Sequence, residues 1–158
     1  MDFIQNNTCC FIGHRTVNET CGLKDALFDI IVDLIENKGV EFFLFGSRSE
    51  FNTLCYSIVN ELSLTYSNIR KVYVRAEYPC IDESYEEYLL QRYDYTYFSE
   101  KILNAGRATY IERNYEMIDK SAFCVFYYDK ESCLKSGTHI AYKYAQKMQK
   151  QNINVYGK

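Results

Sequence analysis

The feature that most constrains the fold of this chain is a regular alternation between short apolar runs and longer segments with helical spacing. The apolar runs cover residues 8–13, 41–46, 71–76, 122–128 and 153–156. Between them, apolar residues recur three or four positions apart over 23–35, 51–62, 111–118 and 140–148, as they do on helices. Strands that alternate with helices predict a mostly parallel sheet with helices on both faces. The sequence therefore predicts a single α/β domain over residues 1–158.

One stretch, residues 77–110, interrupts this alternation. It contains Pro79, an acidic and tyrosine-rich segment at 82–97, and Gly106. Proline and glycine are typical of turns and element ends, and the segment shows no clear period. We expect an irregular insert made of a loop and one or two short helices.

Composition and charge exclude several classes of protein. The chain has 158 residues and a formal net charge of −3, whereas general nucleic-acid binders carry a basic excess. No apolar stretch approaches the length that spans a bilayer, and the first eight residues lack the basic region of a signal peptide. We therefore expect a cytoplasmic protein that has neither a membrane nor a nucleic acid as its partner.

The side chains that most often hold metals show no metal-binding pattern. There are seven cysteines and two histidines, but no Cys-x-x-Cys spacing of the kind that zinc sites use. Cys9, Cys10, Cys55 and Cys124 fall in apolar patterns, so we expect reduced, buried thiols and no metal or other cofactor. Tyrosine is abundant, with 16 residues. Its flat face and polar tip suit either stacking on a base or a subunit interface.

Glycine and polar residues gather at the ends of the predicted strands, where open α/β sheets bind ligands. Gly13, His14 and Arg15 follow the first strand, Gly46, Ser47 and Arg48 the second, Glu77 the third, and Asp129 and then Ser136, Gly137 and Thr138 the strand at 122–128. Because parallel strands end at the same edge, we predict a ligand site there.

The segment 136–138, which opens the last predicted helix, has two interpretations. Free backbone N–H groups and the helix dipole favour a phosphate at such a position, and Gly137 permits close approach. The alternative is an ordinary helix start capped by Ser136 or Thr138.

Other candidates share this ambiguity. Arg15, Arg48 and Arg113 are either phosphate clamps or surface charges, and Ser47 with Glu50 reads as a helix capping box. We expect His14 to be structural or orienting. No nucleophile elbow, Walker A loop or Gly-x-Gly-x-x-Gly motif is present, so no catalytic residue is assigned.

Four segments together resemble a known family. Residues 10–15 (Cys-Phe-Ile-Gly-His-Arg) resemble the C-F-x-G-H-R opening of the YpsA-like branch of the SLOG superfamily, which includes the DNA-processing DprA proteins and the LOG cytokinin-activating enzymes. Residues 112–121 resemble its x-R-N-x-x-M-V-D-x-S helix, 126–129 its A-V-Y-D strand end, and 136–145 its G-G-T-x-x-x-x-x-Y-A helix. The matches fall in order and miss mainly 77–110.

This resemblance implies a Rossmann-like fold that binds nucleotides or nucleotide-derived ligands, such as ADP-ribose-type or cyclic nucleotide signals, and that self-associates into dimers or tetramers. Residues 136–138 would then hold a phosphate, and Arg15 and Arg113 would neutralise it. The remaining candidates have other expected roles: Gly13 and Gly46 would let the backbone approach the ligand, and Glu77, Asn114 and Asp129 would bind ribose hydroxyls or base edges.

The chain departs from the family at two places. The G-G-A-x-G-x-D loop stands here as residues 46–52 (Gly-Ser-Arg-Ser-Glu-Phe-Asn), and a carboxylate at Glu50 would repel a phosphate placed against it. Either this loop contacts ribose, or the phosphate lies nearer 136–138. The LOG enzymes carry P-G-G-x-G-T-x-x-E, but Thr138 is followed by His-Ile-Ala, which speaks against hydrolysis.

Three hypotheses about function follow. The first is a nucleotide-ligand binding domain, without clear catalytic residues, that senses or sequesters its ligand. The second is an enzyme that cleaves an N-glycosidic bond, for which Glu77 and Glu112 are the candidate carboxylates. The third is a regulatory module that binds a protein through residues 82–97.

Overall fold

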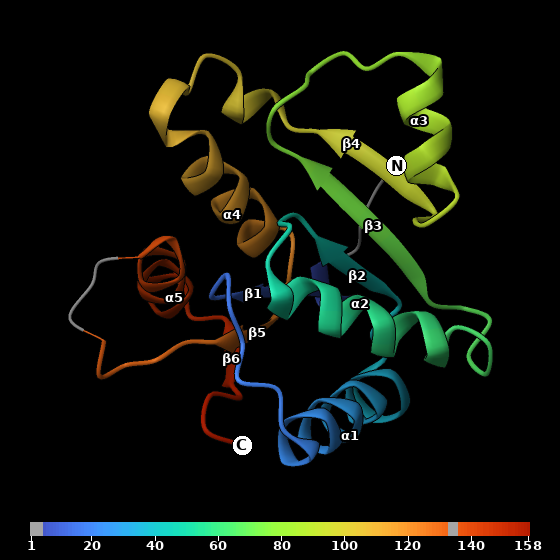
Figure 1. Ribbon diagram of the computed structural model, residues 1–158, viewed down its shortest axis with the longest axis vertical. Helices are drawn as coiled ribbons and strands as arrows, with labels where there is room; N and C mark the ends of the chain where they lie inside the picture. Colours follow the sequence, from blue (N-terminus) through green and yellow to red (C-terminus); the bar gives the residue numbers. More distant parts are fainter. Residues whose placement is uncertain (1–4, 133–135) are drawn as a thin grey trace.

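The centre of the protein is a sheet of six parallel strands, seen in a computed structural model that describes residues 5–132 and 136–158 (Figure 1). The strands are β1 (Thr8–Gly13), β2 (Phe42–Phe45), β3 (Arg70–Arg75), β4 (Tyr95–Phe98), β5 (Phe123–Tyr127) and β6 (Gln151–Asn154). Their spatial order is β4-β3-β2-β1-β5-β6. The chain therefore winds outward from β1 to β4 and then returns to the other side of β1 for β5 and β6.

Helices cover both faces of this sheet. They are α1 (Cys21–Lys38), α2 (Glu50–Leu62), α3 (Glu83–Leu90), α4 (Thr109–Asp119) and α5 (Gly137–Lys147), with short 3-10 turns η1 (Gln5–Asn7), η2 (Glu100–Ile102) and η3 (Gly106–Ala108). α1 and α2 pack on one face and α4 and α5 on the other. The predicted α/β architecture, with a parallel sheet and helices on both faces, is confirmed. Within the described residues, every helix is too short or too polar to traverse a bilayer.

Alternation along β1 divides the core into two layers. Cys9 and Phe11 face α1 and α2, whereas Cys10 and Ile12 face α4 and α5. Cys10 stands opposite Leu44 of β2 and Cys124 of β5 in the two ladders that β1 makes. β1 is thus buried on both faces, as its continuous apolar sequence predicts.

The expected buried thiols are present. Cys9, Cys10, Cys55 and Cys124 are buried, and each cysteine of the described residues is free. Burial raises the pKa of Cys9 and Cys55 well above the ordinary value of a thiol, which keeps them protonated. Buried neutral thiols pack as small apolar side chains.

Local signals fix the ends of α1. The side chain of Thr20 accepts a hydrogen bond from the N–H of Leu23 and caps the helix start. Gly39 follows the last turn with φ +68° and ends the helix there, because glycine adopts this left-handed conformation without strain.

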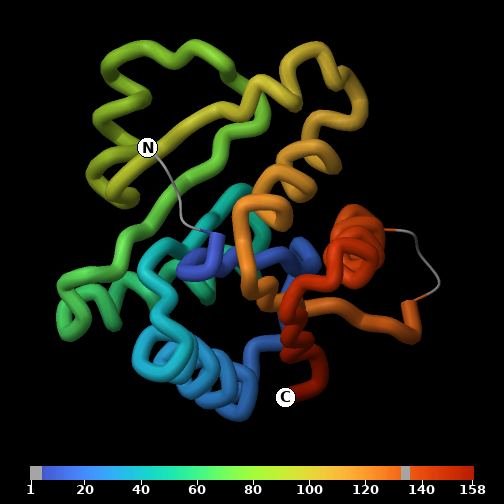
Figure 2. Tube along the Cα trace, turned by 180° about the vertical axis from the view of Figure 1, so that it is seen from behind, coloured from blue at the N-terminus to red at the C-terminus, as the bar shows by residue number. Residues whose placement is uncertain are grey.

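The insert at 77–110 is more regular than the sequence predicts. It contains α3, as expected, but also β4, which pairs in parallel with β3 at the edge of the sheet. Tyr95 to Phe98 are strand-forming residue types, yet the strand is short, half-exposed and lacks aliphatic residues, so the apolar pattern did not reveal it. Figure 2 shows this segment, green to amber, at the end of the molecule away from the C-terminus.

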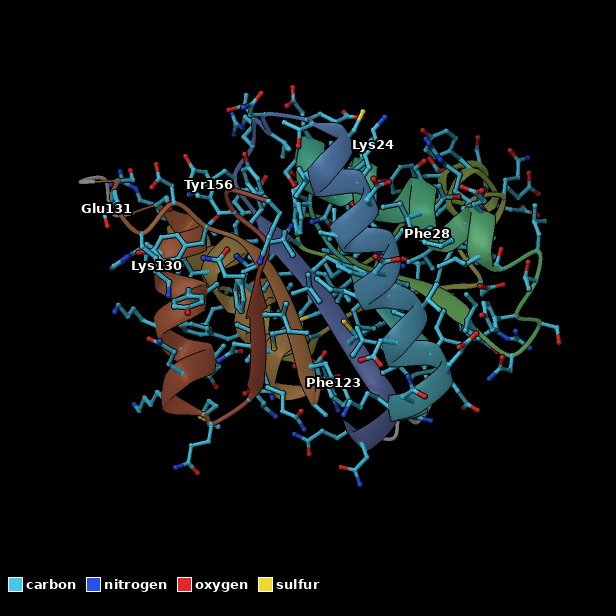
Figure 3. The ribbon with its side chains drawn as sticks, turned by 90° about the horizontal axis from the view of Figure 1, so that it is seen from below. Lys24, Phe28, Phe123, Lys130, Glu131 and Tyr156 are labelled. Carbon is cyan, nitrogen blue, oxygen red and sulfur yellow. The ribbon has the colours of Figure 1, made fainter. Side chains whose placement is uncertain are left out.

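The last strand begins two residues earlier than predicted. β6 covers Gln151–Asn154 rather than 153–156, because the ladder with β5 already pairs Phe123 with Gln151. The side chain of Asn154, the last residue of β6, accepts a hydrogen bond from the N–H of Tyr128 and donates one to its carbonyl. In Figure 3, Tyr156 lies beyond β6 and Lys130 beyond β5, which places both strand ends at one edge.

Gly13 provides a test of the packing between β1 and α2. A Cβ at this position would lie 2.4 Å from Cδ2 of Phe51, whereas a Cβ on Gly137 would meet nothing within 4 Å. We expect Gly13→Ala to lower the free energy of unfolding by about 1–3 kcal/mol through overpacking. Gly137→Ala is the matched control, with an expected change within about 0.5 kcal/mol. Urea denaturation measures both, and equal stability of the two variants would contradict this packing.

Candidate functional site

A cavity of about 600 Å³ lies at the carboxyl edge of the sheet. Its walls come from the segments after β1, β2 and β3, from α4, and from the start of α5, all labelled in Figure 1. Twelve of the thirteen residues predicted from the sequence line it: Gly13, His14, Arg15, Gly46, Ser47, Arg48, Glu77, Arg113, Asn114, Ser136, Gly137 and Thr138. The strand order reverses between β1 and β5, because strands are added on one side of β1 up to β4 and on its other side from β5. Open α/β sheets form ligand crevices at such points.

Asp129 is the predicted residue that does not line the cavity. Its Oδ1 accepts a hydrogen bond from the N–H of Glu131, and its Oδ2 accepts one from the hydroxyl of Tyr156 at 3.2 Å. The carboxylate therefore secures the loop after β5 to the segment after β6. Its backbone N–H contributes to the site indirectly, because it donates to His14.

His14 ties the end of β1 to the end of β5. Its backbone N–H donates to the carbonyl of Tyr127 at 3.2 Å, and its ring Nε2 accepts the N–H of Asp129 at 2.9 Å. An accepting Nε2 requires the neutral ring with its proton on Nδ1. Burial lowers the pKa of His14, and Asp129 offsets part of this effect. This arrangement gives His14 an orienting role.

The loop after β2 is held from within by Asn52. Its Oδ1 accepts the N–H groups of Gly46 and Ser47, and its Nδ2 donates to the carbonyl of Phe11. Those two N–H groups are consequently already bonded to the protein. The predicted capping box is wrong: Ser49 caps α2 by accepting the N–H of Asn52, and the Ser47 hydroxyl bonds Ser49.

Glu50 does not lie in the cavity wall. Its Oε2 accepts the N–H of Val17 at 2.7 Å, and its own N–H donates to the carbonyl of Arg15. The carboxylate fixes the loop that carries Arg15. The repulsion of a phosphate by Glu50, expected from the sequence, therefore has no structural basis.

Gly13 and Gly46 are needed for protein packing. The position of a Cβ on Gly13 is filled by the ring of Phe51, and that of a Cβ on Gly46 by Met117 at 2.6 Å and Arg113 at 2.8 Å. The close approach at both glycines is thus made by the protein's own side chains. Packing against these side chains, rather than the expected approach of a ligand, therefore requires glycine at both positions.

Arg113 is a buried cation beside the cavity. It is 6% exposed, donates from its two terminal nitrogens to the carbonyl of Gly46 and to Oδ1 of Asn114, and lies 5.4 Å from the ring centre of Tyr110. Burial lowers its pKa. Across the described residues, no carboxylate comes within 4.0 Å of its guanidinium. With five N–H donors, Arg113 retains bonding capacity toward the cavity.

The start of α5 supplies backbone donors on the other side. Ser136 caps the helix by accepting the N–H of His139 at 3.1 Å, so the predicted cap is present. The first N–H groups of a helix have no partner within the helix, and those of Gly137 and Thr138 stand at the cavity. The space around Gly137 is open, which leaves room for a group bound to these amides.

The sequence-based assignment missed the cavity wall formed by β3 and the elements next to it, which is called the β3 end of the cavity below. It is formed by Tyr73, Arg75, Tyr78, Tyr85 and Tyr110, with Ser49 nearby. The signal was the high tyrosine content of the chain, but these tyrosines come from β3, the segment after it, α3 and α4, which only the fold brings together. The side chain of Arg75 is used structurally: it donates to the carbonyls of Tyr78 and Pro79 and to the hydroxyl of Thr96.

The cavity is electropositive. Four arginines and one carboxylate, Glu77, line it, although the whole chain carries a net charge of −3. Arg15 and Arg48 also have no carboxylate within 4.0 Å in the described part of the chain. Over residues 5–132 and 136–158, no cluster of three His, Cys, Asp or Glu side chains is placed to hold a metal. The side chains that line the cavity therefore give it an excess of positive charge.

The parallel sheet with its ligand-sized cavity at the carboxyl edge defines a Rossmann-like α/β domain. No protein-family model matches the sequence, and no curated protein matches it. The chain is similar to the X-ray structure of DNA processing protein A (DprA) from Streptococcus pneumoniae, with a TM-score of 0.57 and 12% sequence identity. The match covers 92% of this chain and 48% of that one, so this chain spans about half the length of its structural relative. At this identity, the likeness establishes the fold.

His14 predicts a pH dependence of stability. The pKa of His14 is lowered in the folded state, so the unfolded state binds the proton more readily. The free energy of unfolding therefore decreases as the pH is lowered below the ordinary histidine pKa of about 6.5. Protonation also removes the bond from Asp129, which is worth about 1 kcal/mol.

We expect the urea midpoint to fall more between about pH 7.5 and about pH 5 in the wild type than in His14→Gln. Glutamine keeps an acceptor near the position of Nε2 but does not titrate. Equal pH dependence in the two proteins would show that His14 is not held neutral.

Proposed function

We propose that this protein binds a nucleotide or nucleotide-derived ligand in the cavity, to sense or sequester it, without catalysing its turnover. The observation that carries the proposal is Arg113, a 6% exposed arginine without a carboxylate partner in the described residues, which lines the same cavity as the open start of α5. A phosphate would accept bonds from both.

The cost of burying a charge supports this assignment. Moving an ion out of water costs several kcal/mol of hydration free energy unless an opposite charge or hydrogen bonds compensate for it. The carbonyl of Gly46 and the amide of Asn114 supply two bonds to Arg113, but they leave the positive charge unneutralised. A dianionic phosphate between Arg113, Arg15 and the amides of Gly137 and Thr138 would neutralise it, and charged hydrogen bonds of this kind are strong.

The sequence resemblance agrees with this reading. The motifs at 10–15, 112–121 and 136–145 supply the cavity residues on β1, α4 and α5, and the DprA fold has the same architecture. We therefore propose membership of the SLOG superfamily, in its YpsA-like branch. Within this proposal, ADP-ribose-type and cyclic nucleotide signals are candidate ligands, and self-association into a dimer or tetramer is expected.

Of the two candidate carboxylates for the enzymatic alternative, one lines the cavity. Glu112 does not line the cavity, whereas Glu77 does, and an oxygen of Glu77 accepts the hydroxyl of Tyr110. N-glycosidic cleavage would therefore depend on Glu77 alone. Incubation with nucleoside monophosphates and chromatography for free base tests this reaction, and we expect the nucleotides to remain intact.

Gly137→Glu tests the binding site without disturbing the fold. A side chain at this position meets open space, and a glutamate in the first turn favours a helix through its dipole. A carboxylate about 4 Å from a bound phosphate costs on the order of 4 kcal/mol at an effective dielectric constant of about 20. We expect affinity for nucleotides, measured by isothermal titration calorimetry, to fall at least about 100-fold.

Gly137→Ala is the matched control: its methyl group meets no protein atom within 4 Å and adds no charge, so it should lose much less affinity than Gly137→Glu. Native mass spectrometry of the purified wild type identifies any ligand that it retains. Binding that survives Gly137→Glu would contradict the proposed site. Partner binding that survives it and maps to residues 82–97 would favour the regulatory module.

A further inference from the structure

Glu77 is the one carboxylate among the residues that line the cavity, and it stands in an aromatic environment. It follows the end of β3, and its Oε1 accepts the hydroxyl of Tyr110. Tyr73, Tyr78 and Tyr85 line the same end of the cavity. Among the described residues, no lysine, arginine or histidine nitrogen lies within 4.0 Å of this carboxylate. An exposed carboxylate thus faces the cavity with acceptor capacity to spare.

Arg48 lies at the same end and carries the opposite charge. It follows β2, is exposed, and lines the cavity. A hydrogen bond with Tyr85 raises the pKa of Arg48, with smaller contributions that include Glu77. Arg48 and Glu77 line the same cavity, but their charged groups are more than 4.0 Å apart and do not form an ion pair. A group bound between them would contact both.

Tyrosine walls favour a base over a sugar as this group. Aromatic side chains stack on the flat faces of bases, with about 1–3 kcal/mol for each stacked base, and a ribose offers no such face. Tyr78 and Tyr85 form an edge-to-face pair with ring centres 6.2 Å apart, and Tyr110 is held between Arg113 and Glu77. These contacts order the rings before a ligand arrives.

The polar groups on this wall distinguish between the two purines. A carboxylate offers two acceptors, which match the adjacent N1–H and N2–H donors of guanine. An arginine matches the O6 and N7 acceptors of guanine, the commonest specific contact to a base. Adenine presents a donor beside an acceptor on each of these edges, so a carboxylate would face the N1 lone pair and an arginine would face the amino group.

We propose that the β3 end of the cavity selects guanine over adenine, with Glu77 and Arg48 as the specificity-determining residues. This inference rests on the proposed nucleotide-binding function and deepens it. It favours a guanine-containing nucleotide over an ADP-ribose-type ligand.

The proposal is tested by isothermal titration calorimetry. The nucleotides compared have the same phosphate group and differ only in the base. We expect GMP to bind the wild type at least about tenfold more tightly than AMP, and cyclic GMP more tightly than cyclic AMP, since a bidentate pair discriminates by about 1–3 kcal/mol. Glu77→Gln keeps the size of the side chain but loses one acceptor and the charge, so the preference should shrink to about threefold or less.

Glu87→Gln is the matched control, because Glu87 is an exposed residue of α3 that does not line the cavity. It should keep the preference of the wild type. Equal binding of the two bases, tighter binding of adenine nucleotides, or a guanine preference that survives Glu77→Gln would overturn this inference and leave the proposed function standing. Failure of all four nucleotides to bind the wild type would overturn this inference, and the absence of any nucleotide-derived ligand in native mass spectrometry as well would overturn the proposed function.

Discussion

The edge of a parallel sheet leaves backbone groups without ladder partners where the strands end, and this constraint organises the rest of the structure. Side chains supply the missing partners between neighbouring strands. His14 joins the ends of β1 and β5, Asn52 joins β1 to the loop after β2, and Asn154 joins β5 and β6. Each bond satisfies a polar group that would otherwise be costly to bury.

These bonds also determine what remains available to a ligand. The N–H groups of Gly46 and Ser47 are occupied by Asn52, so the loop after β2 offers mainly its side chains. The unused capacity lies in Arg113 and in the first amides of α5. A site whose arginines bond only neutral groups, with no carboxylate partner among the described residues, is suited to a ligand that brings negative charge.

The residues at the carboxyl edge of the sheet could be predicted from the sequence because strand ends are local features. An apolar run that stops at Gly13 or Gly46 identifies both the strand and the residues that follow it, and parallel pairing then brings them together. The reason for each glycine could not be read in this way, since Phe51 and Arg113 reach them across the fold. The tyrosines at the β3 end of the cavity were missed because they come from separate elements, β3, α3 and α4, and only the fold brings them together. Asp129 was misplaced because its partner, Tyr156, lies beyond a different strand.

The insert between β3 and α4 has a consequence for how such a domain evolves. The cavity residues proposed to bind an anion come from β1, α4 and α5, which carry the motifs, whereas the opposite wall comes from residues 73–85 and from Tyr110. Only Leu89 of α3 is buried, so most of that helix makes little contribution to the core. Mutations could therefore accumulate in this stretch and reshape one wall of the cavity, while the half that carries the motifs and the folding of the protein are inherited unchanged.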